Sequence, residues 1–377
     1  MDFTLSDEQR MLRDLARDFA RREIAPVAAE YDRSAQFPHP VIARARAIDL
    51  TNLSVPTAYG GPGLSVLEIC LVMEELSWGC AGIACALGIN GLAADPVLIA
   101  GTEEQKRRYL AILIDGGFGS YCVTEPDAGS DVIGMKASAR RRGDTYVLNG
   151  SKIWISNALE ANFFVVFAKT DVEAGHRGLS AFLVDREAPG VSVSKKLPKM
   201  GQRASDSCEV VFQDVELARE QLLGQEGDGF RIAMKVFDGS RPMVASFAVG
   251  LAQRALDESR TYAQSRRAFG RPIVEFQGVG FKLAEMGMRT QAARLLTYQA
   301  AWKAGRGERN TLEAAYAKAF AADTAMWAAT EAVQIHGGYG YSEEYPVEKL
   351  MRDAKVLQIY EGTSEIQRTI MVRELTR

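Results

Sequence analysis

Residues 346–368, PVEKLMRDAKVLQIYEGTSEIQR, decide the fold. The mixed charged and apolar run after the opening proline predicts a helix, and Gly362 ends it. Ser364, with Gln367 three residues later, predicts a capping box that starts a last helix. Glu361 is therefore expected in a tight corner beside backbone N–H groups that have no helical partner. Most glutamates in loops are solvated charges, but a carboxylate in such a corner can act as a base beside a held oxyanion.

Composition excludes several classes of protein. The chain has 377 residues and a net charge of −3, so it can hold two or three domains and gives no reason to expect nucleic acid or an anionic membrane as partner. No run reaches the roughly 18 apolar residues of a membrane span, and the acidic first residues lack the apolar core of a signal peptide. Five cysteines without framework spacing indicate reduced thiols, which predicts a cytoplasmic protein or one processed into the mitochondrial matrix. Three histidines without a zinc motif predict no metal site.

The hydrophobic pattern divides the chain into three parts. Residues 1–118 have helical spacing, residues 119–228 shorten into β-rich runs with turn signals, and residues 229–377 return to the helical period. Capping boxes begin helices at Ser6, Ser65 and Thr102. The predicted fold class is α+β and multidomain, with an N-terminal α-helical domain, a middle β-domain and a C-terminal four-helix-bundle domain.

Finer patterns predict which faces are buried and where strands turn. Apolar stripes at helical spacing predict buried faces that include Met11, Leu12, Leu15, Ala16 and Phe19, and later Phe281, Ala284, Met288, Ala292 and Leu295. Asn149-Gly150 predicts a type I′ turn that leads into a strand over 151–156. Buried strands are predicted at 163–168, 179–184 and 209–212.

The segments Arg352 to Lys355 and Ile359 to Arg368 resemble the C-terminal signature of the acyl-CoA dehydrogenases. The resemblance covers essentially the whole chain and is nearest to the medium-chain members, whose first-helix segment residues 22–31 resemble. It implies the acyl-CoA dehydrogenase fold and a homotetramer, a dimer of dimers with FAD between subunits. It also implies an acyl-CoA substrate, electron-transferring flavoprotein as electron acceptor, and Glu361 as catalytic base.

Further motifs in the family's order imply the binding residues. The loop from Tyr121 to Asp131 resembles the signature that holds the flavin, and Trp154 begins a run that packs beside the isoalloxazine in relatives. Without the resemblance, Trp154 reads as a core residue and Arg241 as an exposed charge at a helix start. The residues implied for FAD are Tyr121, Val123, Thr124, Ser130, Trp154, Ile155, Ser156, Arg266, Phe269, Gln277, Gln334, Gly337, Gly338, Thr363 and Glu365. Those implied for the acyl-CoA are Ser130, Asp238, Arg241 and Gly362.

The implied reaction is α,β-dehydrogenation of an acyl-CoA thioester to the trans-2-enoyl-CoA. Glu361 removes the α-proton, the β-hydrogen leaves as hydride to flavin N5, and the Glu361 N–H holds the thioester oxygen. Some branches place the base on the long helix, roughly where Ser240 stands, so Glu361 is favoured. The acyl pocket is expected around 85–92 and 237–245.

Three other functions stay open at this point. One is an enzyme of the same fold that acts on a thioester bound to a carrier protein. Another is a flavin oxidase or monooxygenase that uses oxygen. The third, a DNA-associated flavoprotein, is remote, because that branch should carry a basic surface whereas the net charge is −3.

Overall fold

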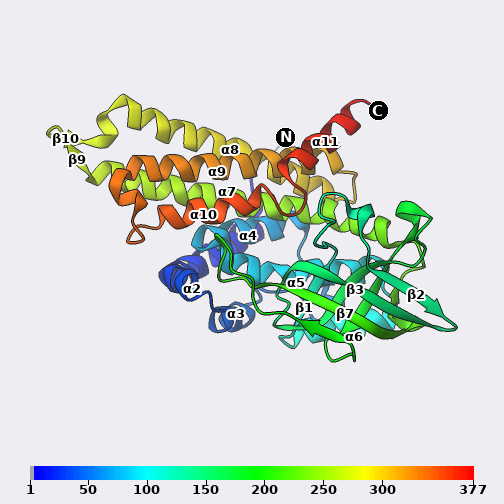
Figure 1. Cartoon of the computed structure of the whole chain (residues 1–377). Coiled ribbons are helices and arrows are strands. Elements are labelled where there is room, and N and C mark those ends of the chain that lie inside the picture. Colours follow the sequence, from blue (N-terminus) through cyan, green and yellow to red (C-terminus); the bar gives the residue numbers. More distant parts are fainter. Residues whose placement is uncertain (1–3) are drawn as a thin grey trace.

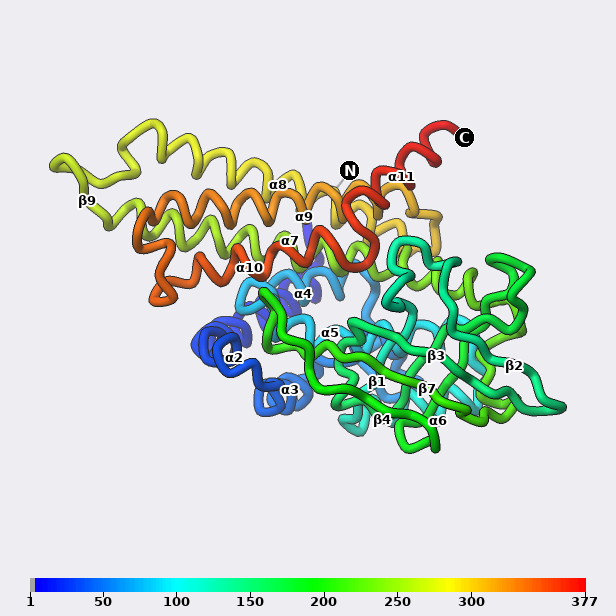
Figure 2. Tube along the Cα trace, viewed as in Figure 1, coloured from blue at the N-terminus to red at the C-terminus, as the bar shows by residue number. Residues whose placement is uncertain are grey.

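The computed structural model describes residues 4–377 and arranges them in three regions, as Figures 1 and 2 show. The C-terminal helices form an elongated bundle, and the green β-region lies below one end of it. Of the N-terminal helices, α4 packs on the bundle helix α7, and α5 packs on both α7 and strand β1. The predicted fold class is confirmed, and the exact domain limits stay a prediction. The first three residues of the acidic start lie outside the described residues.

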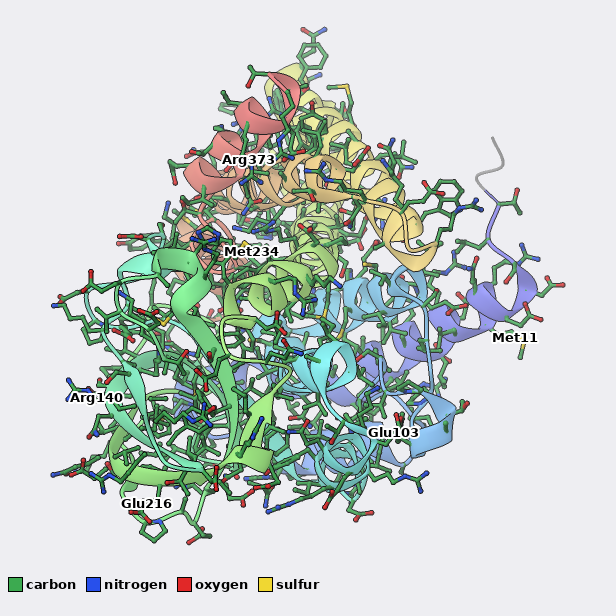
Figure 3. The ribbon with its side chains drawn as sticks, turned by 90° about the vertical axis from the view of Figure 1, so that its right-hand side faces the viewer. Met11, Glu103, Arg140, Glu216, Met234 and Arg373 are labelled. Atoms are coloured by element: carbon green, nitrogen blue, oxygen red, sulfur yellow. The ribbon has the colours of Figure 1, made fainter. Side chains whose placement is uncertain are left out.

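The N-terminal region is helical, as expected. Its helices are α1 (Asp7–Phe19), α2 (Ala28–Ser34), α3 (His39–Arg46), α4 (Val66–Gly79), α5 (Ala81–Ala100) and α6 (Glu103–Ile114), with a π-helical turn Ala20–Ile24 after α1. The capping boxes at Ser6, Ser65 and Thr102 are confirmed. The α1 stripe is partly wrong, because Met11 and Leu15 are 72% and 43% exposed while Ala16 and Phe19 are buried against α4. Figure 3 shows Met11 at the outer edge of the molecule.

Helix α5 is the one described helix long and apolar enough to cross a membrane. Its 18-residue apolar window is 72% buried inside the protein, so α5 is the core helix between the bundle and the sheet. All five cysteines are free and buried, as expected for reduced core thiols.

The middle region is one twisted sheet with apolar side chains buried on both faces. Its strands are β1 (Phe118–Cys122), β2 (Ser138–Arg142), β3 (Thr145–Ser156), β4 (Ala161–Lys169), β5 (Leu179–Asp185), β6 (Val191–Val193), β7 (Ser207–Ala218) and β8 (Leu222–Leu223). Their order is β6-β7-β3-β2-β4-β5-β8, and β1 pairs with β4 in parallel. The predicted buried strands lie within β4, β5 and β7.

The turn predicted at Asn149-Gly150 is wrong. Strand β3 runs straight through this dipeptide, because β7 is long enough to pair with it on both sides. The register shifts between Leu148 and Gly150, and the Asn149 side chain exchanges hydrogen bonds with Asp214 at 3.0 and 2.9 Å. The Asn149-Gly150 pair therefore forms a bulge within the strand, and the Gly150 backbone adopts a φ of +146°.

The C-terminal region is built from long helices. They are α7 (Gly229–Ser265), α8 (Gln277–Gly305), α9 (Thr311–His336), α10 (Val347–Leu357) and α11 (Ser364–Leu375), with a small hairpin of β9 (Arg267–Ala268) and β10 (Arg271–Pro272) after α7. Helix α7 approaches α4 closely, since a Cβ added at Gly250 would lie 2.0 Å from the Glu74 carbonyl oxygen.

The burial predicted for α8 is also wrong. Phe281, Met288 and Leu295 are 67%, 62% and 42% exposed. The face of α8 that packs into the bundle instead carries smaller side chains, including Ala293 and Ala300. Small residues let the helices approach one another, so the larger apolar side chains form a stripe on the outer face of α8.

Candidate active site

Glu361 lies in the corner between α10 and α11, and the backbone there has an uncommon shape. Glu361 and Gly362 both adopt left-handed conformations, with φ of +56° and +88°. A side chain at Gly362 would clash with Gln367, because an added Cβ would lie 2.6 Å from Nε2. Gln367 Nε2 donates to the carbonyl oxygens of Glu361 and Gly362 at 3.3 and 2.9 Å. A left-handed glutamate is strained and needs surrounding contacts of this kind to persist.

The start of α11 differs from the prediction by one residue. Thr363, rather than Ser364, is the N-cap, and its hydroxyl accepts from the Ile366 N–H at 3.1 Å. Within residues 4–377, the N–H groups of Glu361, Gly362 and Thr363 have no hydrogen-bond acceptor. The corner therefore offers three consecutive free donors, as expected for a helix start.

The Glu361 carboxylate is held by a hydroxyl and flanked by two cations. Ser240, on α7, donates from Oγ to Oε2 at 2.8 Å. Burial raises the pKa of Glu361, while the Ser240 hydrogen bond and the charges of Arg241 and Lys318 act in the opposite direction. Burial is the largest of these effects, so the carboxylate is a stronger base than one in water.

Lys318, on α9, was not predicted from the sequence. It is completely buried, and its ammonium donates to the Gly362 carbonyl oxygen at 2.6 Å. Burial lowers its pKa to about 8, although the nearby Glu361 charge raises it. Its position in the Ala-rich run of α9 was the only available signal, because a lysine within an otherwise buried helix face is rare unless it has a partner.

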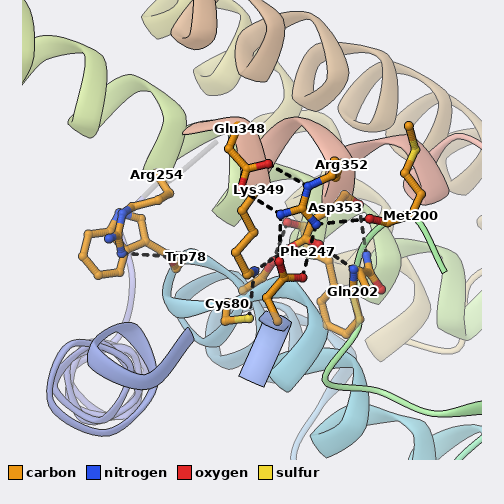
Figure 4. Close-up of polar contacts among 12 residues, drawn as sticks. Trp78, Cys80, Met200, Gln202, Phe247, Arg254, Glu348, Lys349, Arg352 and Asp353 are labelled. Carbon is orange, nitrogen blue, oxygen red and sulfur yellow. Dashed lines mark hydrogen bonds and ion pairs between the residues drawn. The ribbon is translucent and has the colours of Figure 1, made fainter. Parts of the chain in front are cut away.

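The signature before Glu361 anchors α10 to the rest of the molecule (Figure 4). Arg352 pairs with Asp32 at 2.7 Å, and Lys349 pairs with Asp353 at 2.5 Å. The Asp353 carboxylate also accepts a hydrogen bond from the Gln202 N–H. Gln202 belongs to the loop before β7 and Asp32 to α2, so one turn of α10 joins all three regions. This network fixes the helix from which the Glu361 corner projects.

The loop after β1 is held by a buried ion pair that sequence reasoning missed. Lys152 is completely buried, and it donates to Glu125 at 2.8 Å and to the Val123 carbonyl at 3.0 Å. Glu125 also accepts from the N–H groups of Lys136 and Ala137 at 2.6 and 3.0 Å. The loop is thus rigid even though it has little regular structure.

Trp154 is not the core residue that its strand position suggested. The pairing of β3 with β7 shifts between Lys152 and Ile155, and Trp154 adopts a φ of +63° in this bulge. The indole is 57% exposed, whereas the next side chain, Ile155, is 2% exposed. A bulge that turns a large aromatic ring outward suits binding of a flat ring rather than packing.

The residues around this indole differ in exposure. Val123 is buried, and Ser130 is exposed on the loop. The Thr124 carbonyl accepts from the Ile153 N–H at 2.9 Å, and the Ser156 carbonyl accepts from Ser120 at 2.9 Å. The loop is therefore joined to β3 on one side of Trp154, and strand β1 is joined to β3 on the other.

A second group of predicted cofactor residues lies at the other end of the bundle. Arg266 directly precedes the β9–β10 hairpin, Phe269 lies in the turn of that hairpin, and Gln277 begins α8. Phe269 is 95% exposed, and an added Cβ at Gly337 or Gly338 would meet no atom within 4 Å. Gln334, Gly337 and Gly338 lie at the end of α9, on the same side, far from β1 and β3 in Figure 1. One copy of the chain does not bring the two groups together.

The residues predicted for the acyl-CoA lie near Glu361. Arg241 is inside α7 and only 5% exposed, so the interpretation as an exposed helix-start charge is wrong. It pairs with Asp238 at 3.3 Å, its guanidinium lies 5.5 Å from the Phe237 ring centre, and its buried Nε has no partner among residues 4–377. A cavity of about 280 Å³ beside the corner is lined by Asp323, Lys355, Gln358, Ile359, Thr363, Ser364, Glu365 and Arg368.

Three family profiles match the chain in succession. They are described as the N-terminal, middle and C-terminal domains of acyl-CoA dehydrogenase, and they match residues 6–117, 120–215 and 227–376.

Individual relatives agree over nearly the full length. A probable medium-chain specific acyl-CoA dehydrogenase 2, mitochondrial, from Caenorhabditis briggsae is 43% identical and covers 100% of this chain and 92% of its own. The structure of butyryl-CoA dehydrogenase from Megasphaera elsdenii has a TM-score of 0.97 at 44% identity, with both chains covered completely. A third similar chain has a TM-score of 0.97 at 43% identity, with both chains covered completely. It belongs to a structure described as the electron transferring flavoprotein of Acidaminococcus fermentans, towards a mechanism of flavin-based electron bifurcation.

Proposed function

Since the chain belongs to the acyl-CoA dehydrogenase family and is an acyl-CoA dehydrogenase, we propose that Glu361 is its catalytic base. One observation carries this proposal. The Glu361 carboxylate is fixed by Ser240 at 2.8 Å in a corner where burial raises its pKa. A base matched to a weakly acidic α-proton needs such a rise and such a fixed position.

The chain's own groups prepare the proton transfer. Glu361 takes the α-proton of the acyl-CoA on its carboxylate, and the free N–H of the same residue donates to the thioester oxygen as negative charge develops there. The strained left-handed backbone holds the carboxylate and this N–H in a fixed relation to each other. FAD, when bound, supplies the acceptor for the β-hydride.

FAD is the proposed cofactor, and the exposed groups fit it. Trp154, the main chain of Tyr121 at the end of β1, and the loop residues Val123, Thr124 and Ser130 would hold the flavin ring together with Ile155 and Ser156. Thr363 and Glu365 line the cavity beside the corner and would extend the site. Arg266, Phe269, Gln277, Gln334, Gly337 and Gly338 would reach the FAD of a neighbouring copy, where the Arg266 guanidinium suits pyrophosphate.

We propose a homotetramer, a dimer of dimers, because a site split between two ends of the bundle is complete only when two copies combine. The outward stripe of Phe281, Met288 and Leu295 supports an interface on α8. Large contiguous apolar surfaces on soluble proteins usually mark interfaces.

The substrate is an acyl-CoA, and we propose that Ser130, Asp238, Arg241 and Gly362 contact it. The medium-chain preference inferred from the sequence is kept as a proposal, since relatives of similar identity are named for short and for medium chains. Electron-transferring flavoprotein is the proposed acceptor, supported by the similar chain in the Acidaminococcus structure. The proposed location is the cytoplasm, with the mitochondrial matrix as the alternative supported by the relative named mitochondrial.

An absorption spectrum followed by anaerobic titration with straight-chain acyl-CoAs tests the proposal. Yellow protein bleached by an acyl-CoA supports it, and Glu361→Gln should keep the yellow colour while losing the bleaching. Retained bleaching in that variant would refute Glu361 as the base. Yellow protein bleached only by carrier-bound thioesters, or steady peroxide production without an acceptor, would favour the two alternative flavoenzymes.

A further inference from the structure

Asp95 lies on α5, just beyond the segment predicted to line the acyl pocket. Helix α5 packs against β1 and α7, and these elements carry Tyr121 and Ser240. The neighbouring residues Ala94 and Val97 belong to the same apolar cluster as Tyr121 and Phe237, and the Glu361 charge raises the pKa of Asp95. A carboxyl group therefore lies on the helix that packs beside these two aromatic rings.

This carboxyl group is poorly satisfied by the protein. Ser54 Oγ donates to Oδ1 at 3.3 Å, and no other hydrogen bond or ion pair reaches Asp95 from residues 4–377. Burial raises the pKa of Asp95 to about 7, and Glu361 is the one charged group that contributes. By accessible area Asp95 is half-buried. A carboxylate that loses much of its water without gaining a cation is costly, so such groups in proteins are normally paired or satisfied by a ligand.

The Tyr121 hydroxyl is a second polar group without a partner in the same place. It is buried and has no hydrogen bond within the described chain. Its ring packs edge-on against Phe167 and Phe237, with centroids 5.0 and 6.1 Å away. Burial and the charges of Glu361 and Asp95 raise its pKa, whereas the charge of Arg241 lowers it. Buried unpaired hydroxyls are rare in folded proteins and call for a specific explanation.

We propose that Asp95 and Tyr121 recognise a hydrogen-bond donor, an ammonium or a hydroxyl group, carried on the acyl tail of the substrate. This inference rests on the proposed function and names its substrate class. A purely aliphatic tail would bury the Asp95 carboxyl against methylene groups and leave both polar groups unsatisfied. An ammonium would pair with the carboxylate, and a hydroxyl could donate to Asp95 while accepting from Tyr121.

The test compares matched substrates on the purified FAD-loaded enzyme. Pentanoyl-, hexanoyl- and octanoyl-CoA are assayed with an artificial electron acceptor beside their ω-hydroxy and ω-amino counterparts. We expect kcat/KM to favour a donor-bearing substrate at one or more chain lengths by roughly tenfold, the worth of a charge-assisted hydrogen bond. An aliphatic preference at every length would overturn the inference while leaving the proposed dehydrogenase intact. If no acyl-CoA is oxidised, the proposed function itself fails and this inference falls with it.

Variants separate the two donors and exclude a folding effect. Asp95→Asn keeps an acceptor without charge, so it should lose an ammonium preference roughly tenfold but keep a hydroxyl preference. Asp95→Leu should lose both and improve the aliphatic substrates, and Tyr121→Phe should weaken the hydroxyl preference more than the ammonium preference in protein that still holds FAD. Asp144→Asn, in the exposed turn between β2 and β3, is the matched control. Unchanged substrate ratios in Asp95→Asn and Asp95→Leu protein that still holds FAD would overturn the inference.

Discussion

Replacement of Lys318 by methionine should reduce activity without reducing stability. Lys318 is completely buried, and burial lowers its pKa from 10.5 to about 8. At about 1.4 kcal/mol per pKa unit, the charged form costs the folded protein about 3 kcal/mol at neutral pH. The hydrogen bond to Gly362 returns only about 1 kcal/mol, and the Gly362 carbonyl keeps its bond from Gln367 at 2.9 Å. The variant should therefore be more stable by about 2 kcal/mol at neutral pH.

The sign of the pH dependence provides a further check. A lysine whose pKa is lowered in the folded state destabilises that state fully below the folded value. The cost disappears as pH rises from about 8 toward 10.5, where the unfolded lysine also loses its proton. The stability difference between wild type and Lys318→Met should thus shrink near pH 10. Urea denaturation at neutral and alkaline pH measures it, with Lys235→Met on the exposed face of α7 as control.

Activity should respond in the opposite direction to stability. The Lys318 charge opposes the rise in the pKa of Glu361 that burial causes, so its loss should raise that pKa further and move the acid limb of the kcat/KM profile to higher pH. The rate near neutral pH should fall. A variant that is several kcal/mol less stable, as after an ordinary core truncation, would refute the electrostatic reasoning, and so would an unshifted pH profile.

Three further outcomes are expected. Lys152→Met leaves Glu125 buried without its cation, so it should destabilise the protein by about 3–5 kcal/mol and weaken FAD binding. The double variant with Lys152→Met and Glu125→Leu should recover part of the stability. Trp154→Ala should leave the melting temperature of the FAD-free protein unchanged, because the indole is 57% exposed, yet alter the flavin spectrum; a large loss of stability would contradict the bulge. Met288→Glu should split the tetramer in analytical ultracentrifugation, and an unchanged mass would exclude α8 from the interface.

The order of the regions was predictable because the hydrophobic period changes twice along the chain. Capping boxes at Ser6, Ser65 and Thr102 were reliable, since they depend on contacts within four residues. Errors arose where distant partners decide the outcome. Asn149-Gly150 reads locally as a turn, but β7, more than 50 residues later, pairs across it. The outer stripe of α8 reads locally as a buried face, because the pattern shows a face but not what covers it.

In the candidate site, too, local features could be predicted from the sequence and contacts between distant segments could not. The corner at Glu361 was predicted from its glycine and the following helix start. The groups that give Glu361 its chemistry were not, because Ser240, Lys318 and Arg241 come from two other helices. From the sequence, Lys318 and Lys152 look like ordinary surface charges, but in the structure both are completely buried. The spacing of residues within one segment does not indicate which lysine will be buried.

The corner is stable because its strain is distributed over three regions. A left-handed glutamate backbone costs on the order of 1 kcal/mol or more, and it would relax if α10 could shift. Helix α10 cannot shift easily, since Arg352 is paired with Asp32 and Asp353 accepts from the Gln202 backbone. A side chain on Gly201 would come within 2.5 Å of the α10 backbone, so that loop and α10 are in direct contact. The conformation of the base is therefore maintained by Arg352 and Asp353, which belong to the helix that leads into the Glu361 corner.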